Sequence, residues 1–451
     1  MIVCKFGGTS VGTAEAIARL IEIVGGRRSE APVVVVSALS GVTDQLLALG
    51  RLLGSEHREE RAAKLETIRT RHAGIAGELS VPAEALAPIE TELSALGRWL
   101  DERRAPSLPP ADLDHLAAHG ERWSSRLIVA AMGRRGLPAE WVDARQVIVT
   151  DGSFTRARPA PDAIRAQAGL ILKPILTAGR IPVIQGFVGG TPDGRTTTLG
   201  RGGSDYTASL LGAALHVDRV EIWTDVDGIM TADPRIVPNA RVLPVASHVE
   251  AAEMATFGAK VLHPATQAPL VEARIPCVVL NSFAPERAGT TVVSGLRPGP
   301  VGNSPVRSIS FKRGVTVVNI RAAEMPGAVG FLRRLFEVIE RHGAAVDVIS
   351  TSEINVSFTL DDVTDLAGIA ADLGQLGEVT VYERRAIVAV IGVGLRGTRG
   401  LSGRLFSAIR DVNVEMISQG ASEINVTLVV QEEDGPSAVR LLHAEFFAEE
   451  G

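Results

Sequence analysis

Short apolar runs alternate with segments of helical periodicity over the first 295 residues. Ile2–Cys4 precedes a lysine and a glycine pair, and apolar residues then recur every three or four positions from Thr13 to Val24. Pro32–Val36 is a continuous β-branched run, which is typical of a buried parallel strand. Further strands are predicted at Trp141–Asp143, Val147–Val149, Ile181–Ile184, Val220–Trp223 and Pro276–Leu280. Other helical segments are predicted over 45–104, 113–132 and 208–215.

This alternation predicts an α/β fold with an open, mostly parallel sheet and helices on both faces. Polar, glycine-rich segments follow several strands, so the site is expected along the carboxyl ends of the strands. After the first strand comes Lys5-Phe6-Gly7-Gly8-Thr9-Ser10, where backbone amides and a helix N-terminus can face an anion. A second such loop, Leu199–Tyr206, carries Arg201 and Asp205. The first loop alone leaves two interpretations open, an anion site or a glycine turn used only for packing.

The C-terminal part of the chain contains an internal repeat. Val346–Ser350 recurs as Val414–Ser418, and Ser352–Val356 recurs as Ser422–Val426. Each copy is predicted as strand, helix, strand, strand, helix, which indicates two ferredoxin-like βαββαβ units. The second copy ends before a last strand, so the copies are expected to share or exchange strands. The predicted organisation is a catalytic domain 1–295, a linker 296–306 rich in Pro, Gly, Ser and Asn, and two repeats, 307–384 and 385–451.

A glycine motif in the second repeat imitates a dinucleotide site. Gly392, Gly394 and Gly397 fit G-x-G-x-x-G after the predicted strand Ala386–Ile391. The unit that carries them is too small for half of a Rossmann sheet. A dinucleotide site is therefore not expected here.

Composition narrows the possible function classes. A net charge of −6 gives no support to a nucleic-acid partner, and no apolar run has the length of a membrane span. Cys4 and Cys277 form no C-x-x-C motif, which suits a reducing compartment and argues against a structural zinc site, so a cytoplasmic location is expected. Only five of the 46 basic residues are lysines, and two of these, Lys5 and Lys260, lie next to glycine-containing motifs.

Four separated motifs resemble those of the aspartate kinase (aspartokinase) family of the amino acid kinase superfamily. They are Lys5–Ser10, Leu199–Tyr206, Thr224–Arg235 and Phe257–Pro264. The tandem repeat resembles the two ACT domains of that family, so the resemblance covers essentially the whole chain. Since no homoserine dehydrogenase extension follows the repeat, the chain resembles the monofunctional form.

The resemblance implies that ATP and L-aspartate give ADP and 4-phospho-L-aspartate, the first step toward lysine, threonine, methionine and diaminopimelate. Lys5 is then expected at the transferring phosphoryl group, with Asp205 holding it in place and Lys260 as a further catalytic cation. Arg201 would pair with the α-carboxylate of aspartate and Glu121 with its α-ammonium. The implied substrate-binding residues are Thr43, Glu121, Phe187, Arg201 and Ser204.

The same resemblance implies an ATP site with Mg²⁺ between the phosphates and no dedicated metal-binding residues. The implied nucleotide contacts are Lys5, Gly7, Gly8, Thr9, Ser37, Ala38, Thr224, Asp225, Met230, Arg235 and Lys260. Met230 departs from the family, in which a tyrosine is common at this position. Adenine contact at Met230 is therefore an open question.

The repeat is expected to bind an effector amino acid, lysine or threonine or both, and to join subunits as a homodimer or a dimer of dimers. The residues that resemble the lysine-binding segment of lysine-sensitive members are Met325, Phe331, Val346, Asp347, Thr351, Ser352 and Glu353. Ala328 stands where such members often carry serine, which leaves the effector open. The alternatives are that these residues only build a subunit interface, that a sibling kinase phosphorylates another acid, or that the chain is a catalytically silent sensor.

Overall fold

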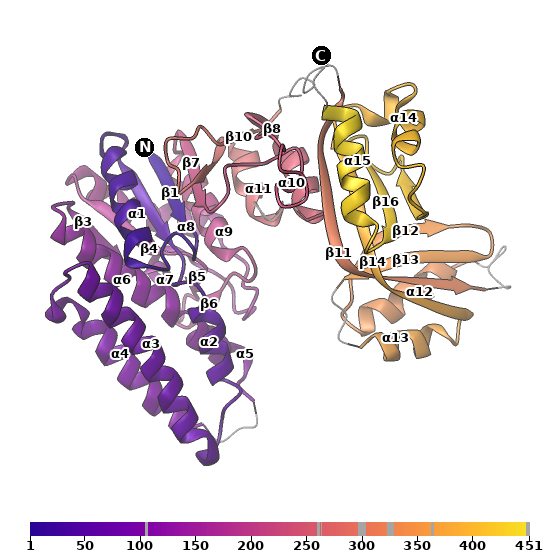
Figure 1. Ribbon diagram of the computed structural model, residues 1–451. Coiled ribbons are helices and arrows are strands. Elements are labelled where there is room, and N and C mark those ends of the chain that lie inside the picture. The colour runs from indigo at the N-terminus through magenta and orange to yellow at the C-terminus, as the bar shows by residue number, and fades with distance from the viewer. Residues whose placement is uncertain are drawn as a thin grey trace. The chain divides into compact units, whose positions relative to one another are not determined.

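The computed structural model of the chain describes residues 1–103, 107–258, 262, 264–295, 304–322, 329–361 and 365–447. These residues form two units (Figure 1). The first consists of 1–229, 244–248 and the described residues of 261–296. The second consists of 230–243, the described residues of 249–260, and the C-terminal part of the chain. The first unit thus differs from the predicted domain 1–295, because the segments 230–243 and 249–260 group with the repeat.

An eight-stranded sheet forms the centre of the first unit, in the order β3-β4-β2-β1-β7-β9-β10-β8. The strands are β1 (Ile2–Phe6), β2 (Pro32–Val36), β3 (Ala139–Val142), β4 (Ile181–Gln185), β7 (Arg219–Thr224), β8 (Val245–Ser247), β9 (Cys277–Asn281) and β10 (Thr290–Val293). From β3 to β9 all neighbours are parallel, and only β10 pairs antiparallel with β9. The predicted mostly parallel sheet is confirmed. A separate hairpin consists of β5 (Val188–Gly190) and β6 (Thr196–Thr198).

Helices cover both faces of this sheet. The α-helices described in this unit are α1 (Ala14–Gly26), α2 (Val42–Leu49), α3 (Arg58–Glu78), α4 (Ala83–Asp101), α5 (Pro110–Ala117), α6 (His119–Arg134), α7 (Ala144–Val147), α8 (Pro161–Thr177), α9 (Gly203–Leu215) and α11 (Pro264–Ala273). Cys4 and Phe6 pack in one apolar core with residues of α1 and α6. Because side chains alternate along a strand, Lys5 points to the opposite face, where α9 lies against β1.

Three predicted elements differ from the structure. Val147–Val149 is not a strand, because the Asp143 carboxylate accepts a hydrogen bond from the Arg145 amide and so caps the short helix α7. The predicted helical stretch 45–104 is divided among α2, α3 and α4. The predicted helix 113–132 is interrupted at Ala118 between α5 and α6, an interruption that apolar periodicity does not reveal.

A six-stranded sheet, in the order β12-β13-β11-β14-β16-β15, forms the centre of the second unit (Figure 1). Its elements are β11 (Val306–Arg321), α12 (Phe331–Arg341), β12 (Val346–Thr351), β13 (Asn355–Asp361), α13 (Leu366–Leu373), β14 (Glu378–Gly392), α14 (Leu401–Ala408), β15 (Val414–Gln419), β16 (Asn425–Gln431) and α15 (Gly435–Phe447), preceded in the chain by α10 (His248–Thr256), which begins in the first unit.

The two repeats share the long strands β11 and β14. Residues 315–321 of β11 pair with β13, whereas residues 306–313 pair with the half of β14 that also pairs with β16. The strand missing from the second copy is therefore the first half of β11, so the two repeats have strands in common in this sheet. The Gly392 motif follows β14 in this antiparallel sheet, and so it does not open a parallel βαβ unit. Among the described helices, none is both long and apolar enough to span a bilayer.

Candidate active site

The carboxyl ends of β1, β2, β4 and β7 surround two cavities in the first unit. The Arg201 cavity, of about 320 Å³, is lined by Lys5, Ser37, Thr43, Glu121, Phe187, Gly200, Arg201, Gly202, Gly203, Ser204 and Asp205. The glycine-loop cavity, of about 460 Å³, is lined by Gly7, Gly8, Thr9, Ser37, Ala38, Leu39, Ser40, Gly41, Thr43, Asp44, Glu121, Thr224 and Asp225. Ser37, Thr43 and Glu121 line both, so the two cavities adjoin.

Lys5 and Asp205 form an ion pair at the Arg201 cavity. Lys5 Nζ lies 2.6 Å from Asp205 Oδ1, and the two side chains are only 10% and 14% exposed. Asp205 lies in the first turn of α9, where a carboxylate is favoured by the helix dipole. The pair therefore presents an ammonium whose position is fixed by a rigid helix.

Glu121 is a buried carboxylate that faces the same cavity from the first turn of α6. It is 4% exposed, and its Oε2 atom has no hydrogen-bond partner among the described residues. Burial raises the pKa of Glu121 to about 8, although backbone amides of Glu121 and Ala38 act in the opposite direction. Gly120 makes this placement possible, since a Cβ atom there would lie 2.8 Å from Ala38 Cβ. A buried carboxylate with an unused oxygen is suited to accept a cationic group.

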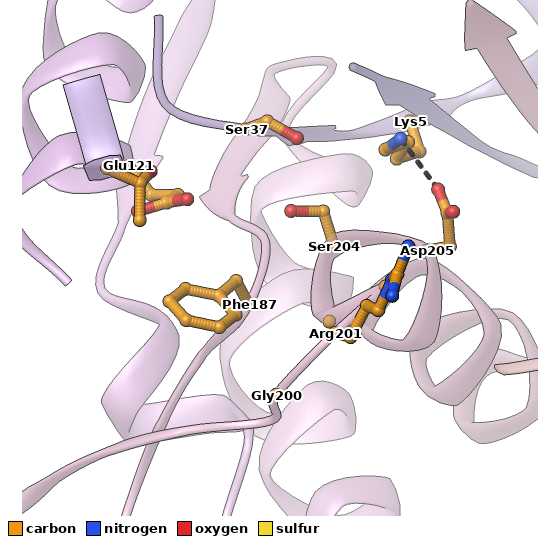
Figure 2. Close-up of a pocket in the computed structure, with 11 residues that line it drawn as sticks. Lys5, Ser37, Glu121, Phe187, Gly200, Arg201, Ser204 and Asp205 are labelled. Atoms are coloured by element: carbon orange, nitrogen blue, oxygen red, sulfur yellow. Dashed lines mark ion pairs between the residues drawn. The ribbon is translucent and has the colours of Figure 1, made fainter. Parts of the chain in front are cut away.

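Phe187 and Ser204 also line this cavity. Figure 2 shows Glu121 and Phe187 on one side of the cavity and the Lys5–Asp205 pair on the other. Phe187 has φ +67°, a conformation rare for a bulky residue, and its amide donates to Thr207 Oγ1 at 3.0 Å. Ser204 packs so closely against Gly186 that a Cβ on this glycine would lie 2.5 Å from Ser204 Cβ. Together these contacts define a small polar cavity with an aromatic wall.

The glycine loop after β1 lines the neighbouring cavity. The Gly7 amide donates to Trp223 O and the Ser10 amide donates to Gly7 O, while the amides of Gly8 and Thr9 make no hydrogen bond to any residue that the structure describes. Thr13 then caps α1 by accepting from the Ala16 amide at 3.1 Å. Free amides beside a helix start form the kind of concave surface that binds phosphate.

Comparisons with known proteins agree with this architecture. The model of the amino acid kinase family matches residues 1–281, and that of an ACT domain matches 318–364 and 388–446. Over 457 residues the chain is 40% identical to lysine-sensitive aspartokinase 3 of Escherichia coli (strain K12), covering 99% of both proteins. It is 34% identical to the chloroplastic aspartokinase 2 of Arabidopsis thaliana, covering 99% of this chain and 84% of that protein. The chain belongs to the aspartokinase family.

Solved aspartokinase structures share the fold over the full chain. The chain matches E. coli aspartokinase III in complex with aspartate and ADP with a TM-score of 0.85 at 39% identity, covering 99% of this chain and 100% of that one. It matches the same enzyme in complex with lysine and aspartate with a TM-score of 0.86 at 39% identity, covering 99% of each. These are the complexes of a relative.

Most residues predicted for this aspartokinase's substrates lie at the two cavities. All five predicted aspartate contacts line the Arg201 cavity, and seven predicted ATP contacts line the glycine-loop cavity, namely Gly7, Gly8, Thr9, Ser37, Ala38, Thr224 and Asp225. Met230 and Arg235 belong to the second unit and line neither cavity. Arg235 is 88% exposed and paired with Asp233. Lys260 lies outside the described residues.

The described residues contain no group of three or more acidic, histidine or cysteine side chains arranged to hold a metal ion. Besides Glu121, which also lines the Arg201 cavity, two carboxylates, Asp44 and Asp225, line the glycine-loop cavity. Mg²⁺ in kinases is commonly held by one or two carboxylates together with the phosphates of the nucleotide. These residues therefore fit a magnesium ion that arrives with the nucleotide.

The structure describes six of the seven predicted effector residues, and all six lie in the first repeat. Met325 is outside the described residues. Thr351, Ser352 and Glu353 are exposed, whereas Phe331 is buried in the core of the repeat. Asp347 and Asp361 both pair with Lys312 Nζ, at 2.7 and 2.8 Å. The Asp347 carboxylate, which is expected to hold the ammonium group of an effector, is thus already paired with the ammonium group of Lys312.

Two residues that support the cavities, Arg71 and Asp114, belong to no sequence motif and were not predicted. Arg71 of α3 donates to Ser40 O at 2.6 Å and to Gly12 O at 3.1 Å, which links the loops after β1 and β2. Asp114 of α5 accepts three hydrogen bonds near the Arg201 cavity. Both residues lie in helical stretches where charged side chains are common, so no signal in one sequence distinguishes them.

Proposed function

We propose that this aspartokinase transfers the γ-phosphoryl group of ATP to the side-chain carboxylate of L-aspartate, giving ADP and 4-phospho-L-aspartate. The observation that carries this proposal is the position of Lys5. It lines the Arg201 cavity beside Asp205, while Gly7, Gly8 and Thr9, which follow it in the chain, line the glycine-loop cavity. A cation at this point would face both the side-chain carboxylate of the bound aspartate and the phosphate groups of ATP. The product would enter the biosynthesis of lysine, threonine, methionine and diaminopimelate.

In this proposal an aspartate side-chain oxygen attacks the γ-phosphorus as the bond to the β–γ bridging oxygen breaks. The carboxylate is already ionised at neutral pH, so no general base is required. Catalysis then depends on position and on neutralisation of negative charge. Lys5 supplies that charge at the transferring group, and Asp205 holds Lys5 in place. Lys260 is proposed as a further cation.

Two charged groups would recognise the amino acid. The Arg201 guanidinium matches an α-carboxylate in a fork-to-carboxylate geometry. The unused oxygen of Glu121 would accept from the α-ammonium, which favours the ionised form of a carboxyl that burial otherwise keeps protonated. Thr43, Phe187 and Ser204 complete the proposed aspartate site.

The glycine-loop cavity is the proposed site of the nucleotide phosphates, with Gly8 and Thr9 as amide donors. Ser37, Ala38, Thr224 and Asp225 are proposed as further nucleotide contacts, and Met230 and Arg235 remain predictions from the family resemblance. When bound, Mg²⁺ would neutralise the phosphates, and Asp44 and Asp225 are the carboxylates of this chain suited to hold it.

Feedback control by lysine is part of the proposal. The E. coli relative is named lysine-sensitive and was solved with lysine bound. In the first repeat, Asp347 and Asp361 already hold the ammonium of Lys312, which is the same chemical group as the end of a lysine side chain. Val346, Thr351, Ser352 and Glu353 are proposed as further effector contacts, together with Phe331 and Met325, as the family resemblance implies.

A homodimer or dimer of dimers through the repeats is proposed with it. Exposed apolar side chains gather on the first repeat, including Val329, Leu332, Phe336, Ile349 and Ile354. A cytoplasmic location is also proposed, because both cysteines are buried and unpaired in the structure.

The proposal is tested by incubating the purified protein with ATP, Mg²⁺ and hydroxylamine, which traps acyl phosphates as hydroxamates. Aspartate should give hydroxamate, and glutamate should give little or none. Product with glutamate but not aspartate would identify a sibling kinase instead. No product with either acid, together with tight lysine binding, would identify a sensor.

A further inference from the structure

Asp114 is a buried carboxylate beside the Arg201 cavity that the proposed chemistry does not use. It is 1% exposed and lies on α5, which packs against β6. Burial raises the pKa of Asp114, and donors from Thr198 and Thr155 partly offset that rise. Burying a carboxylate is costly unless it is fully hydrogen-bonded. The hydrogen bonds that Asp114 accepts therefore indicate why a carboxylate occurs at this buried position.

The donors to Asp114 belong to Thr198, the last residue of β6, and to Thr155, whose carbonyl oxygen lies close to Gly200 in the lining of the cavity. Asp114 Oδ2 accepts from the amides of Thr155 and Thr198, each at 2.9 Å, and Oδ1 accepts from Thr198 Oγ1 at 2.6 Å. Thr155 has φ +69°, which is rare for a β-branched residue, and its amide bond to Asp114 helps to hold it there.

Thr198 is the last residue of the β5–β6 hairpin, whose base carries two of the proposed aspartate contacts. Phe187 directly precedes the hairpin, and Arg201 follows it by three residues. The Leu199 amide donates to Phe187 O at 2.9 Å and closes the base, while the Ala157 amide donates to Thr198 O at 3.0 Å. A carboxylate that fixes Thr198 therefore fixes the path of the chain to Arg201.

We propose that Asp114 is a positioning residue for the aspartate site: it anchors the base of the β5–β6 hairpin and so sets the position of Arg201 and Phe187. This inference rests on the proposed function of the Arg201 cavity. Asp114 does not touch the substrate. Its effect should fall on aspartate binding and not on the glycine-loop cavity, because Phe187 and Arg201, which flank the hairpin, line the Arg201 cavity and not the glycine-loop cavity.

The Asp114→Asn variant tests whether the hairpin requires the hydrogen bonds of Asp114 or its negative charge. In Asp114→Asn, one amide oxygen can accept from both backbone amides, and the amide nitrogen can donate to the Thr198 hydroxyl, which also accepts. Asp114→Asn should therefore keep the hairpin in place. Asp114→Ala removes all three contacts. Asp112→Ala is the matched control, because Asp112 lies on the same helix and pairs only with Arg103 among the contacts described.

The experiment measures KM for aspartate and for ATP in the hydroxamate assay. Asp114→Ala should raise KM for aspartate about tenfold or more, since small displacements of binding groups can cost up to a hundredfold. KM for ATP should change by no more than about twofold, and Asp114→Asn and Asp112→Ala should stay near the wild type. Equal increases in both KM values, or an unchanged KM for aspartate, would overturn the inference.

Two further measurements keep the inference testable. If Asp114→Ala does not fold, Thr198→Val, which removes only the hydroxyl contact, should raise KM for aspartate while Thr198→Ser does not. Hydrogen exchange should be faster at 196–203 in Asp114→Ala and unchanged at 2–12; unchanged exchange at both would overturn the anchoring role. A wild type without activity on aspartate would contradict the proposed function, whereas an active wild type with a normal Asp114→Ala variant would contradict this inference alone.

Discussion

At the proposed site, the protonation of Glu121 is expected to depend on whether the ligand is bound. Burial raises the pKa of Glu121 from its ordinary value of 4.5 to about 8. Between these values the folded protein holds a proton that the unfolded chain has released, so this group's contribution to the free energy of unfolding falls as pH rises through that window. An ammonium at the unused oxygen would reverse the preference and favour the carboxylate.

Aspartate binding at pH 7 should therefore release a proton from Glu121. The expected result, with ADP present, is release of close to one proton per site, measured by calorimetry in buffers of different ionisation enthalpy. Glu121→Gln should bind aspartate weakly and release almost none. Binding by the wild type without proton release would contradict the assigned role of Glu121.

At the scale of elements, the glycine loop depends on helix α3, which contributes no residue to either cavity. Arg71 holds the carbonyls of Gly12 and Ser40, one from each of the loops after β1 and β2. A guanidinium can bridge two acceptors in a fixed fork, whereas a lysine ammonium on a flexible stem does so poorly. The spacing of the two loops should therefore depend on arginine.

Arg71→Ala should raise KM for ATP by roughly three- to tenfold and leave KM for aspartate closer to the wild type, with Arg71→Lys intermediate. Steady-state kinetics with each substrate varied in turn provides the measurement. Arg69→Ala, on the same helix but paired with Glu66 and Glu90, is the control. If the two variants behave alike, Arg71 has no special role at the loops.

These contacts also show which parts of the site could be predicted. The strand–loop–helix pattern around Lys5 left an anion site and a packing turn open, and the family resemblance predicted Asp205, far away in the sequence, as the partner of Lys5. Arg71 and Asp114 could not be predicted, because their partners are backbone groups that only the fold brings near. The break between α5 and α6 at Ala118 was missed for a similar reason: both helices have the same apolar periodicity.

At the scale of the whole molecule, two segments predicted to belong to the catalytic domain pack with the repeat. Met230 O accepts from Ser308 Oγ at 2.9 Å, and Glu253 accepts from Asn425 Nδ2 at 2.6 Å. The predicted nucleotide residues Met230 and Arg235 therefore belong to the unit that carries the proposed effector site. The apolar pattern did not predict this grouping. Both segments precede the predicted linker 296–306 in the chain, and so they were assigned to the catalytic domain.

Lysine should inhibit the enzyme, and the two repeats supply a matched pair of variants. Asp347 pairs with Lys312, and its counterpart in the second repeat, Glu415, pairs with Arg385 at 2.6 Å. Asp347→Ala should raise the lysine concentration for half-inhibition by about tenfold or more, as expected for loss of a charged contact, while Glu415→Ala should have little effect. Inhibition curves of the hydroxamate assay measure this. Equal loss of sensitivity in both variants would contradict an effector site in the first repeat.

The central claim is that phosphoryl transfer occurs beside Lys5, which lines the Arg201 cavity, while the glycine loop that follows it in the chain lines the adjoining cavity. The most direct test is the single-turnover rate of Lys5→Ala at saturating ATP and aspartate, with Lys173→Ala on the exposed surface of α8 as control. Loss of charge stabilisation at the reacting group should lower the rate of Lys5→Ala by roughly a hundredfold or more, with the fold intact by circular dichroism. A Lys5→Ala rate within about threefold of the Lys173→Ala rate would contradict the claim.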